Sequence, residues 1–242
     1  MTDFSGRTIL VTGAAGGIGA AIVRHLVAAN ADVVASSRDT SSLDGIVAET
    51  GCRSVRFDLT SEDEIASALG DLDLWGVVNC GGFGGEIASP MDTDIDVFDK
   101  VMAVNARGTL LVTKYAARTM IRLGVGGAIV NVSSQASLVA LESHVSYGSS
   151  KAAVDNITRV SALELGKHGI RVNSVHPTVV MTEMSAFYWG RPEIGGPFLD
   201  QMPLGRWATQ DEVAAPVVFL LSDGASMITG AHLPIDGGYT CR

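Results

Sequence analysis

The sequence of 242 residues contains little cysteine and has a deficit of positive charge. Its three cysteines, Cys52, Cys80 and Cys241, are odd in number and form no Cys-x2-Cys pair, so they offer neither a zinc motif nor a disulfide framework, and we expect reduced thiols. Lysine and arginine number 17 against 26 aspartates and glutamates, a net charge of -9. Nucleic-acid phosphates are bound by clustered Lys and Arg, so we expect no nucleic-acid partner.

Long hydrophobic runs and targeting signals are also missing. The longest apolar stretch, VAAPVVFLL at 213–221, is far shorter than a membrane span and contains Pro216. The opening segment, MTDFSGRTIL, has no basic region followed by an apolar one. We therefore expect a cytoplasmic protein with no membrane partner.

The composition that remains, with 47% hydrophobic residues and 28 glycines, is typical of a tightly packed α/β protein. Helical patterns alternate with β-prone segments at 7–12, 31–36, 53–57, 74–79 and 128–132, and two more strands follow toward the C-terminus. This alternation predicts a Rossmann-type, doubly wound parallel sheet with helices on both faces. No linker divides the chain, so we expect a single domain over 1–242, with a cofactor-binding part at about 1–130 and a catalytic and substrate part at about 131–242.

A glycine loop follows the first predicted strand. TGAAGGIG places Gly13, Gly17, Ile18 and Gly19 before an apolar-periodic helix at about 18–29. Glycine lets the backbone turn tightly and approach a pyrophosphate, and the helix amino end offers it N–H groups and a positive dipole. The Gly-x3-Gly-x-Gly spacing differs from the common Gly-x-Gly-x2-Gly fingerprint, and a lone glycine loop can also be only a turn. Between a strand and a helix, however, the loop predicts a dinucleotide site.

The end of the second predicted strand bears on the choice of dinucleotide. An acidic residue there would hydrogen-bond the 2′-hydroxyl of NAD ribose, but the sequence has Ser37 and Arg38. A guanidinium cannot accept hydroxyl hydrogens, whereas it can bind a 2′-phosphate bidentately, with serine hydroxyls assisting. NADP is therefore favoured over NAD. The alternative is that Asp39 neutralises Arg38 in a surface ion pair.

The stretch 127–154 predicts a buried strand, a loop and the start of a helix. Ser134 lies just beyond the carboxyl end of the predicted strand, and α/β proteins bind ligands at the carboxyl ends of their strands. Tyr147 and Lys151 are four residues apart and share a helix face, so the ammonium is expected to lower the pKa of the phenol by several units. Each residue alone has an ordinary structural explanation. Together they suggest proton transfer to a carbonyl that Ser134 polarises.

These motifs resemble one enzyme family over nearly the whole chain. Ser-x12-Tyr-x3-Lys and TGxxxGIG are similar to the motifs of short-chain dehydrogenases/reductases. The resemblance implies NAD(P)-dependent interconversion of a carbonyl and a secondary alcohol. It also adds Asn105, within a helical pattern at 96–123, to Ser134, Tyr147 and Lys151 as a catalytic tetrad. Within the family, VNVSSQ, HPTVVMT, SALELG and TGAHLPIDGG resemble the L-xylulose reductase group.

The resemblance also implies the rest of the dinucleotide site. Asp58 and Leu59 stand where the family contacts adenine, although a strand-end aspartate also suits a turn or a helix cap. Asn79 and Gly81 lie in Asn-Cys-Gly-Gly, where the family has Asn-Asn-Ala-Gly, and Cys80 is expected to pack rather than react. The other implied cofactor positions are Tyr147, Lys151, Pro177, Val180 and Thr182, while the neighbouring His176 receives no catalytic role.

Substrate contacts are implied for Gln135, His144 and Trp189, beside Ser134 and Tyr147. Trp189 lies in 183–206, a segment rich in aromatic residues, glycine and proline, without strong periodicity, that we expect to be a mobile lid. The polar side chains would pair with a ketopentose or a vicinal dicarbonyl, but a steroid or acyl chain would leave them unpaired. The alternative is that Gln135 and His144 bond only the loop backbone.

Two other functions remain compatible with the sequence. A reductase of steroids or 3-oxoacyl thioesters would share every residue of the tetrad, and a catalytically silent dinucleotide-binding regulator would keep the same fold. The intact tetrad argues against a silent regulator. The resemblance and the apolar C-terminal segment further imply a homotetramer acting on a small-molecule carbonyl or alcohol.

Overall fold

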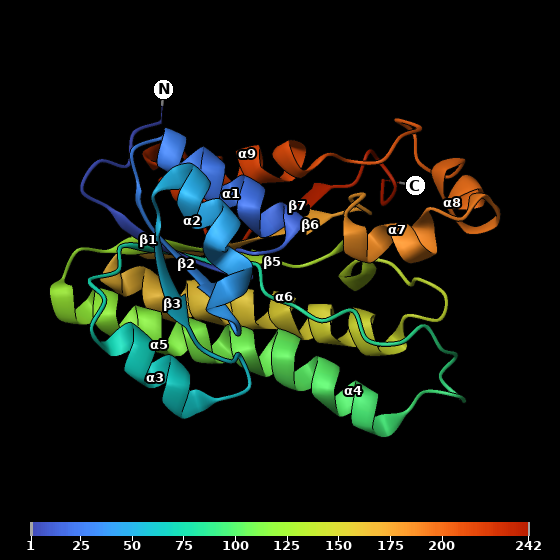
Figure 1. Cartoon of the computed structure of the whole chain (residues 1–242), viewed down its shortest axis with the longest axis horizontal. Helices are drawn as coiled ribbons and strands as arrows, with labels where there is room; N and C mark the ends of the chain where they lie inside the picture. Colours follow the sequence, from blue (N-terminus) through green and yellow to red (C-terminus); the bar gives the residue numbers. More distant parts are fainter. Residues whose placement is uncertain (1, 242) are drawn as a thin grey trace.

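In the computed structural model, which describes residues 2–241 apart from the side chains of Glu183 and Met184, seven strands form one parallel sheet (Figure 1). The strands are β1 (Thr8–Thr12), β2 (Asp32–Ser37), β3 (Arg53–Arg56), β4 (Gly76–Asn79), β5 (Gly127–Val132), β6 (Ile170–Pro177) and β7 (His232–Ile235). Their order is β3-β2-β1-β4-β5-β6-β7, and every neighbouring pair is parallel. The winding reverses between β1 and β4, so the predicted doubly wound sheet is confirmed.

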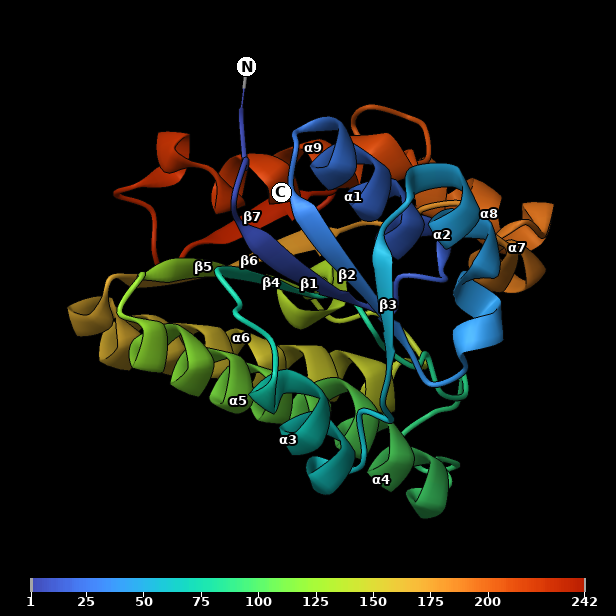
Figure 2. The same cartoon turned by 60° about the vertical axis from the view of Figure 1, so that its left-hand side comes forward.

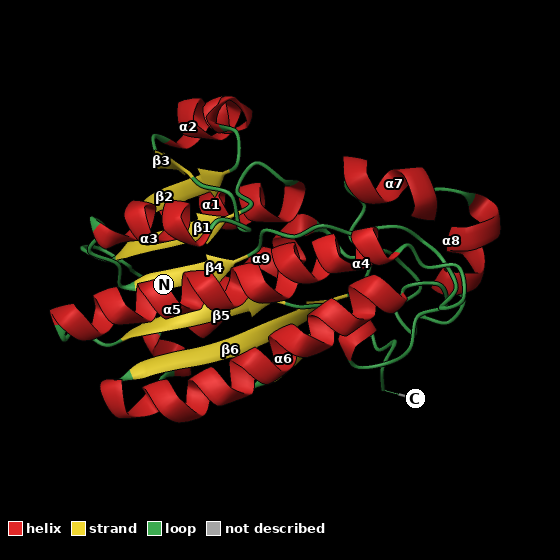
Figure 3. Ribbon diagram, turned by 90° about the horizontal axis from the view of Figure 1, so that it is seen from below, coloured by secondary structure: helices red, strands yellow, loops and turns green. Residues whose placement is uncertain are grey.

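Helices cover both faces of this sheet. One face carries α1 (Gly17–Ala28), α2 (Asp44–Thr50) and α9 (Gln210–Leu221); the other carries α3 (Glu62–Gly70), α4 (Ile95–Met102), α5 (Gly108–Leu123) and α6 (Val145–Leu165) (Figure 1, Figure 2). The helices α7 (Glu183–Trp189) and α8 (Pro192–Leu199) lie beyond one end of the sheet (Figure 3). Within 2–241, no helix has both the length and the apolar character needed to cross a bilayer.

The buried strands divide their side chains between two hydrophobic cores. In β1, Ile9 and Val11 face the core under α1 and α9, whereas Leu10 faces the core under α3, α5 and α6. In β5, Val130 faces the first core and Ile129 the second. Strands buried on both faces read as continuous apolar runs, which is why the sequence predicts them. The two cores hold the strands in place, and with them the loops that follow the carboxyl ends of the strands. The candidate site described below lies at these ends.

The helical pattern at 96–123 forms α4 and α5, joined without a break by a π-helical turn at Ala103–Arg107. Asn105 lies in this turn, and its side chain is buried. The predicted helix is therefore present over nearly its predicted span, but the π turn was not predicted because it leaves no signature in the apolar pattern. Single π turns inside α-helices are frequent at functional sites.

Residues 183–206 are more regular than the sequence predicts. Thr182 caps α7 by accepting a hydrogen bond from the backbone N–H of Ser185, and α8 begins at Pro192, a residue suited to a first helical turn. Helices of seven and eight residues show little periodicity, which explains why the sequence did not reveal them.

Candidate active site

The carboxyl end of β5 and the first turns of α6 bring Ser134, Tyr147 and Lys151 together. The Lys151 side chain is buried, and its Nζ donates to the carbonyl oxygen of Val132 at 2.8 Å. The same Nζ is 5.6 Å from the centroid of the Tyr147 ring, so the ammonium and the phenol are neighbours as the spacing predicts. Ser134 Oγ accepts a hydrogen bond from the backbone N–H of Ala136 at 3.1 Å, which leaves its own hydrogen to donate.

Asn105 ties the π turn to the loop after β4 and to α6. Its Oδ1 accepts from the backbone N–H of Phe83 at 2.7 Å, and its Nδ2 donates to the Phe83 carbonyl at 2.9 Å and to Ser150 Oγ at 3.0 Å. A Cβ on Gly82 would lie 3.3 Å from Asn105 Oδ1 and 3.7 Å from Lys151 Nζ. Asn105 and Lys151 therefore flank one glycine, which leaves room for a small ligand atom that a side chain would fill.

The glycine loop forms a cradle against the loop after β4. Gly13 has a φ of +65°, and a Cβ on it would lie 2.6 Å from Gly81 Cα. Gly19 packs on the carbonyl of Gly13, and a Cβ on Gly17 would lie 2.8 Å from Thr182 Cγ2. The predicted cofactor residues from three separate segments thus converge. A side chain at Gly13 or Gly17 would collide with another segment, and one at Gly19 would collide with the loop itself.

Thr12 and Leu59 complete this cradle. The Thr12 hydroxyl oxygen accepts from the backbone N–H groups of Cys80 at 3.1 Å and Gly81 at 3.0 Å, which joins the ends of β1 and β4. A Cβ on Gly81 would lie 2.7 Å from Leu59 Cδ1. Sequence reasoning missed Thr12; its only signal is a polar residue that ends an apolar strand immediately before the glycine loop.

The amino end of α1 points its free backbone N–H groups into the cradle. Its N-cap is Gly16, which has no side chain to satisfy those donors. Ile18 packs its side chain on the hydrophobic core, so only its backbone faces a ligand. Glycines without room for a Cβ and an uncapped helix amino end together fit the pyrophosphate of a dinucleotide.

At the end of β2, Arg38 is exposed and free to meet an anion. Among the described side chains, which exclude that of Glu183, no carboxylate oxygen lies within 4.0 Å of its guanidinium nitrogens. Asp39, the expected competitor, accepts instead from the backbone N–H and the hydroxyl of Ser41 at 3.0 Å and 2.8 Å. The hydroxyls of Ser37 and Ser42 are 2.9 Å apart, so Ser37 is held beside Arg38.

Asp58 and Asn79 show how strand-end polar residues divide their roles. Asp58 Oδ1 accepts from the backbone N–H and hydroxyl of Thr60 at 2.8 Å and 2.7 Å, which is the alternative turn role. Burial acts to raise the pKa of Asp58, but these bonds and the charges of Arg38 and Arg56 outweigh it and hold the pKa below its usual value. Asn79 Nδ2 donates inward to Asn131 Oδ1 at 2.8 Å, while its Oδ1 is buried and has no hydrogen-bond partner among the described residues.

The segment after β6 runs past the glycine loop. Pro177 is the last residue of β6, and Val180 is buried and pairs with Ala208 in an isolated bridge. Thr182 caps α7 beside Gly17. The segment thus connects the glycine cradle to α7 and α8.

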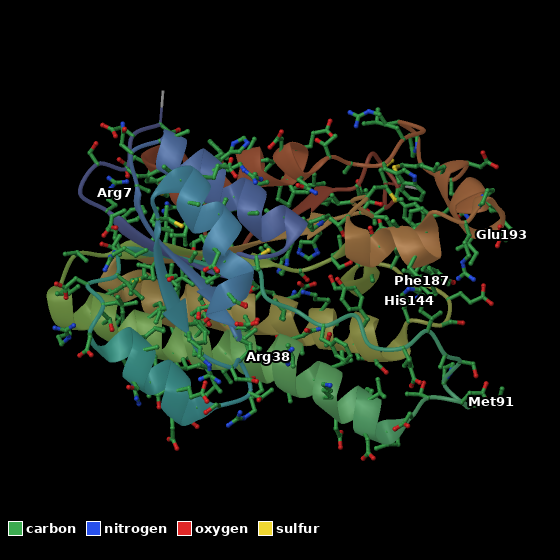
Figure 4. All side chains as sticks on the ribbon, in the orientation of Figure 1. Arg7, Arg38, Met91, His144, Phe187 and Glu193 are labelled. Carbon is green, nitrogen blue, oxygen red and sulfur yellow. The ribbon has the colours of Figure 1, made fainter. Side chains whose placement is uncertain are left out.

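The predicted substrate residues lie on the other side of the tetrad. Gln135 is buried in a 3-10 turn directly after Ser134, and its Oε1 has no hydrogen-bond partner among the residues that the structure describes. His144 precedes α6 and lies under α7 (Figure 4); its Nδ1 is 2.6 Å from the Glu142 carbonyl, which accepts a hydrogen bond from it. The loop-backbone alternative therefore holds for Nδ1 of His144. Its Nε2, which has no partner among the described residues, carries the lone pair of the neutral ring and can accept a hydrogen bond.

An aromatic cluster carries Trp189 over this side of the site. The His144 and Trp189 rings stack at 5.8 Å between centroids, and Trp189 lies 4.7 Å from the Phe198 ring of α8. Phe198 in turn stacks on Trp207 at 5.7 Å and on Tyr239 at 4.7 Å. The covering helices thus rest on rings contributed by three distant parts of the chain.

Cys80 lies at the edge of the cradle and packs as expected. Burial raises the pKa of its thiol to about 11, although the charge of Lys151 acts in the opposite direction. A thiol with this pKa stays protonated at neutral pH and is a weak nucleophile.

Comparison with known proteins identifies the family. The sequence model described as Enoyl-(Acyl carrier protein) reductase matches residues 13–240. L-xylulose reductase from Caenorhabditis elegans is 42% identical over 98% of this chain and 97% of that protein. A solved structure of a short-chain type dehydrogenase/reductase from Mycobacterium ulcerans superposes with a TM-score of 0.96 at 36% identity, covering 99% of this chain and 92% of that one. The chain belongs to the short-chain dehydrogenase/reductase family.

As a short-chain dehydrogenase/reductase, the chain is an oxidoreductase whose family uses a nicotinamide dinucleotide. D-threitol dehydrogenase from Mycolicibacterium smegmatis is also similar, at 38% identity over 98% of this chain and 94% of that protein. The resemblance predicted from the sequence motifs is therefore confirmed at the level of family and reaction class. One of these relatives is named after a ketose, L-xylulose, and another after a polyol, D-threitol.

Proposed function

We propose that this short-chain dehydrogenase/reductase is an NADPH-linked reductase of small hydroxylated ketones, such as a ketopentose or a vicinal dicarbonyl. The observation that carries the proposal is the buried amide oxygen of Gln135, the residue that directly follows Ser134, which has no hydrogen-bond partner among the described residues. A buried acceptor without a partner costs about 1–3 kcal/mol, which a substrate hydroxyl would recover. The names of the related L-xylulose reductase and D-threitol dehydrogenase support the same substrate class.

The residues proposed to hold the dinucleotide are distributed along the cradle. Gly13, Gly17, Ile18 and Gly19 would bind the pyrophosphate through the backbone, and Asp58, Leu59, Asn79 and Gly81 would line the adenosine end. Pro177, Val180 and Thr182 would line the nicotinamide end, and Tyr147 and Lys151 would meet the adjoining ribose. This assigns residues up to about 130 mainly to the cofactor and later residues mainly to catalysis and substrate, in a single domain.

Residues of the cradle would hold a reduced nicotinamide dinucleotide, which would be the source of the hydride for the carbonyl carbon. The chain supplies the proton: the Tyr147 hydroxyl donates it to the carbonyl oxygen, which completes the alcohol. Ser134 donates a hydrogen bond to that oxygen as negative charge develops on it. The Lys151 ammonium beside the phenol favours loss of its proton. Asn105, which hydrogen-bonds the Phe83 backbone and Ser150 Oγ, would position a water that returns the proton.

Preference for NADP rests on Arg38 and Ser37. The guanidinium is exposed and has no carboxylate partner within the described residues, so binding a 2′-phosphate breaks no existing ion pair. A carboxylate at this position, which NAD ribose would call for, is absent from Ser36, Ser37 and Arg38.

We also propose a cytoplasmic homotetramer. Apolar side chains are exposed on α6 and at the edge strand β7, including Leu163 at 83% and Leu233 at 37% exposure. A second exposed group, Leu110 and Ile121, lies on α5. Exposed apolar side chains on the neighbouring helices α5 and α6, and others at the edge strand β7, suit an assembly with two kinds of interface. Sedimentation that showed a monomer at micromolar concentration would contradict the tetramer.

The experiment that tests the function measures kcat/KM for L-xylulose, diacetyl, a long-chain ketone and a 3-oxoacyl thioester, each with NADPH and with NADH. We expect the highest value for one of the two small substrates with NADPH. The highest value for the long-chain ketone or the thioester would replace the proposed substrate class, and preference for NADH would overturn the cofactor assignment.

A further inference from the structure

Three ionisable side chains are buried together beside the catalytic serine: Asp155 of α6, His176 of β6 and His232 of β7. Their nitrogen and oxygen atoms lie within 4.8 Å of one another. His176 Nε2 is 3.1 Å from His232 Nδ1 and 3.5 Å from Asp155 Oδ1. The His176 side chain is fully buried, and that of His232 is 20% exposed. The mechanism above gives this cluster no role.

The partners at the two ends of the cluster assign both histidine tautomers. His176 Nδ1 is 3.2 Å from the carbonyl oxygen of Ser134, which can only accept, so Nδ1 carries the hydrogen. His232 Nε2 is 3.2 Å from Arg159 Nη1, which can only donate, so Nε2 carries the lone pair and Nδ1 the hydrogen. His176 Nε2 is then left as an acceptor facing the Nδ1–H of His232.

The resulting hydrogen-bond chain runs in one direction through four elements. It starts at Arg159 on the surface of α6, passes through His232 and His176, and ends on the carbonyl of Ser134. Ser174 Oγ lies 2.8 Å from His176 Nε2 and 2.9 Å from His232 Nδ1, so it can bridge the two rings. All of these donors and acceptors are satisfied only when both histidines are neutral.

We propose that His176 and His232, as a neutral hydrogen-bonded pair, are positioning residues that hold the backbone of Ser134 and thereby aim its hydroxyl at the substrate carbonyl. The proposal rests on the catalytic role of Ser134 given under Proposed function. The hydroxyl of Ser137 donates to the same carbonyl at 2.7 Å and lies 3.1 Å from His176 Nδ1, so the cluster also holds the turn that follows.

Protonation would break this chain. A proton on His176 Nε2 would face the hydrogen on His232 Nδ1, and the donor contact between the rings would be lost. The charged groups that face the pair all come from α6: Asp155 favours protonation, whereas Lys151 opposes it at His176 and Arg159 opposes it at His232. Burial, the largest influence, lowers the pKa of both rings, so the neutral pair persists below the usual histidine range.

The same tautomers weigh against a cation at this cluster. A metal ion would need lone pairs on both His176 Nε2 and His232 Nδ1. The hydrogen of His232 would then move to Nε2 and point at the donor of Arg159. Asp155 Oδ1 is moreover already engaged by the hydroxyl of Ser133 at 2.6 Å.

Kinetics of single variants test the positioning role. His176→Phe fills the site but removes the donor to Ser134, whereas His176→Asn keeps a donor near the position of Nδ1 and cannot titrate. We expect His176→Phe to lower kcat with L-xylulose about tenfold or more at pH 8, with Kd for NADPH changed less than about twofold. His176→Asn should stay within about threefold of wild type, and the loss of kcat toward acid pH should begin at a lower pH. The control is His168→Phe, an exposed histidine beyond α6.

Equal kcat for wild type and His176→Phe, or an unchanged acid limb in His176→Asn, would overturn the proposal. Should His176→Phe fail to fold, ring nitrogen NMR shifts of 15N-histidine-labelled wild type decide the matter at pH 7.5. We expect His176 and His232 both neutral with hydrogen on Nδ1; hydrogen on Nε2, a charged ring or metal-bound shifts at either residue would overturn the chain. This spectrum does not depend on turnover, so it stays decisive even if no ketone is reduced and the proposed function fails.

Discussion

The proposed dinucleotide cradle and the proposed substrate side of this oxidoreductase are built in opposite ways. In the cradle, Gly13, Gly17 and Gly81 bring three segments so close that a Cβ at each would lie 2.6–2.8 Å from a neighbouring atom. On the substrate side, contacts are made by large side chains such as Trp189 and Phe198, whose rings lie 4.7 Å apart. The shape of the cradle therefore depends on glycines, which have no side chain, whereas the shape of the substrate side depends on large aromatic side chains.

The difference indicates which part of the function each region fixes. A ligand common to a whole family is bound by backbone and helix dipole, which tolerate little change in residue size. A substrate that differs between relatives is bound by side chains on separate elements, each replaceable on its own. In the proposed mechanism, Tyr147 and Lys151 take part in both regions, since they meet the ribose of the cofactor and the carbonyl of the substrate.

The largest expected effect is on kcat in a Tyr147 variant, and it should leave the affinity for NADPH nearly unchanged. Tyr147→Phe keeps the ring beside Lys151 but removes the proton donor, so kcat should fall about a thousandfold or more. Kd for NADPH, measured by fluorescence titration, should change less than about threefold because the ring still fills its place. The matched control is Tyr115→Phe on α5, whose hydroxyl bonds Glu62 at 3.0 Å. Turnover within tenfold of wild type in Tyr147→Phe would refute the mechanism.

A smaller effect is expected in the cradle, confined to the dinucleotide. Arg38→Asp removes the partner of a 2′-phosphate and adds repulsion, so the ratio of kcat/KM for NADPH over NADH should fall about a hundredfold. The KM for the carbonyl substrate should be unchanged. Arg122→Asp, the same charge change in the last turn of α5, serves as control. If the ratio moves equally in both variants, Arg38 does not contact the cofactor.

On the substrate side, the effect should depend on the substrate and spare the cofactor. Gln135→Leu and His144→Leu should each raise KM for L-xylulose about tenfold, as expected for one lost hydrogen bond to a hydroxyl. For diacetyl, which has no hydroxyl, the change should stay within about twofold. His168→Leu is the control for a lost histidine. Equal changes for both substrates would mean that these residues only support the loop.

The smallest expected effect is on stability and does not involve either ligand. Burial lowers the pKa of His176 and His232, so the unfolded chain binds protons more readily than the folded one once the pH drops below about 6.5. Stability should therefore fall as pH is lowered from about 6.5 toward the folded pKa values and level off below them. A Tm lower by a few degrees at pH 5.5 than at pH 7 is expected. A His176→Asn, His232→Asn double variant should show a flatter dependence, and an equally steep one would contradict the assignment.

The same contrast explains what could be predicted from the sequence. The parallel sheet, Gly13 to Gly19 and the Tyr147–Lys151 pair depend on local order, and spacing reveals them. The hydroxyl of Thr12 bonds the backbone of Cys80, 68 residues away, and His176 contacts His232, 56 residues away. Nothing near Thr12 or His176 in the sequence indicates these partners. The π turn around Asn105 changes hydrogen bonding without changing the apolar pattern. Long-range polar contacts and short helices are what this sequence does not reveal.

The most direct test of the account follows the hydride itself. Wild-type enzyme is incubated with L-xylulose and NADPH deuterated at both C4 positions, and the pentitol product is analysed by mass spectrometry. The account predicts one deuterium per pentitol molecule, on the carbon that was the carbonyl, and no labelled product from Tyr147→Phe under the same conditions. A wild-type enzyme that binds NADPH yet forms no deuterated pentitol would contradict the assignment of this chain as a ketose reductase.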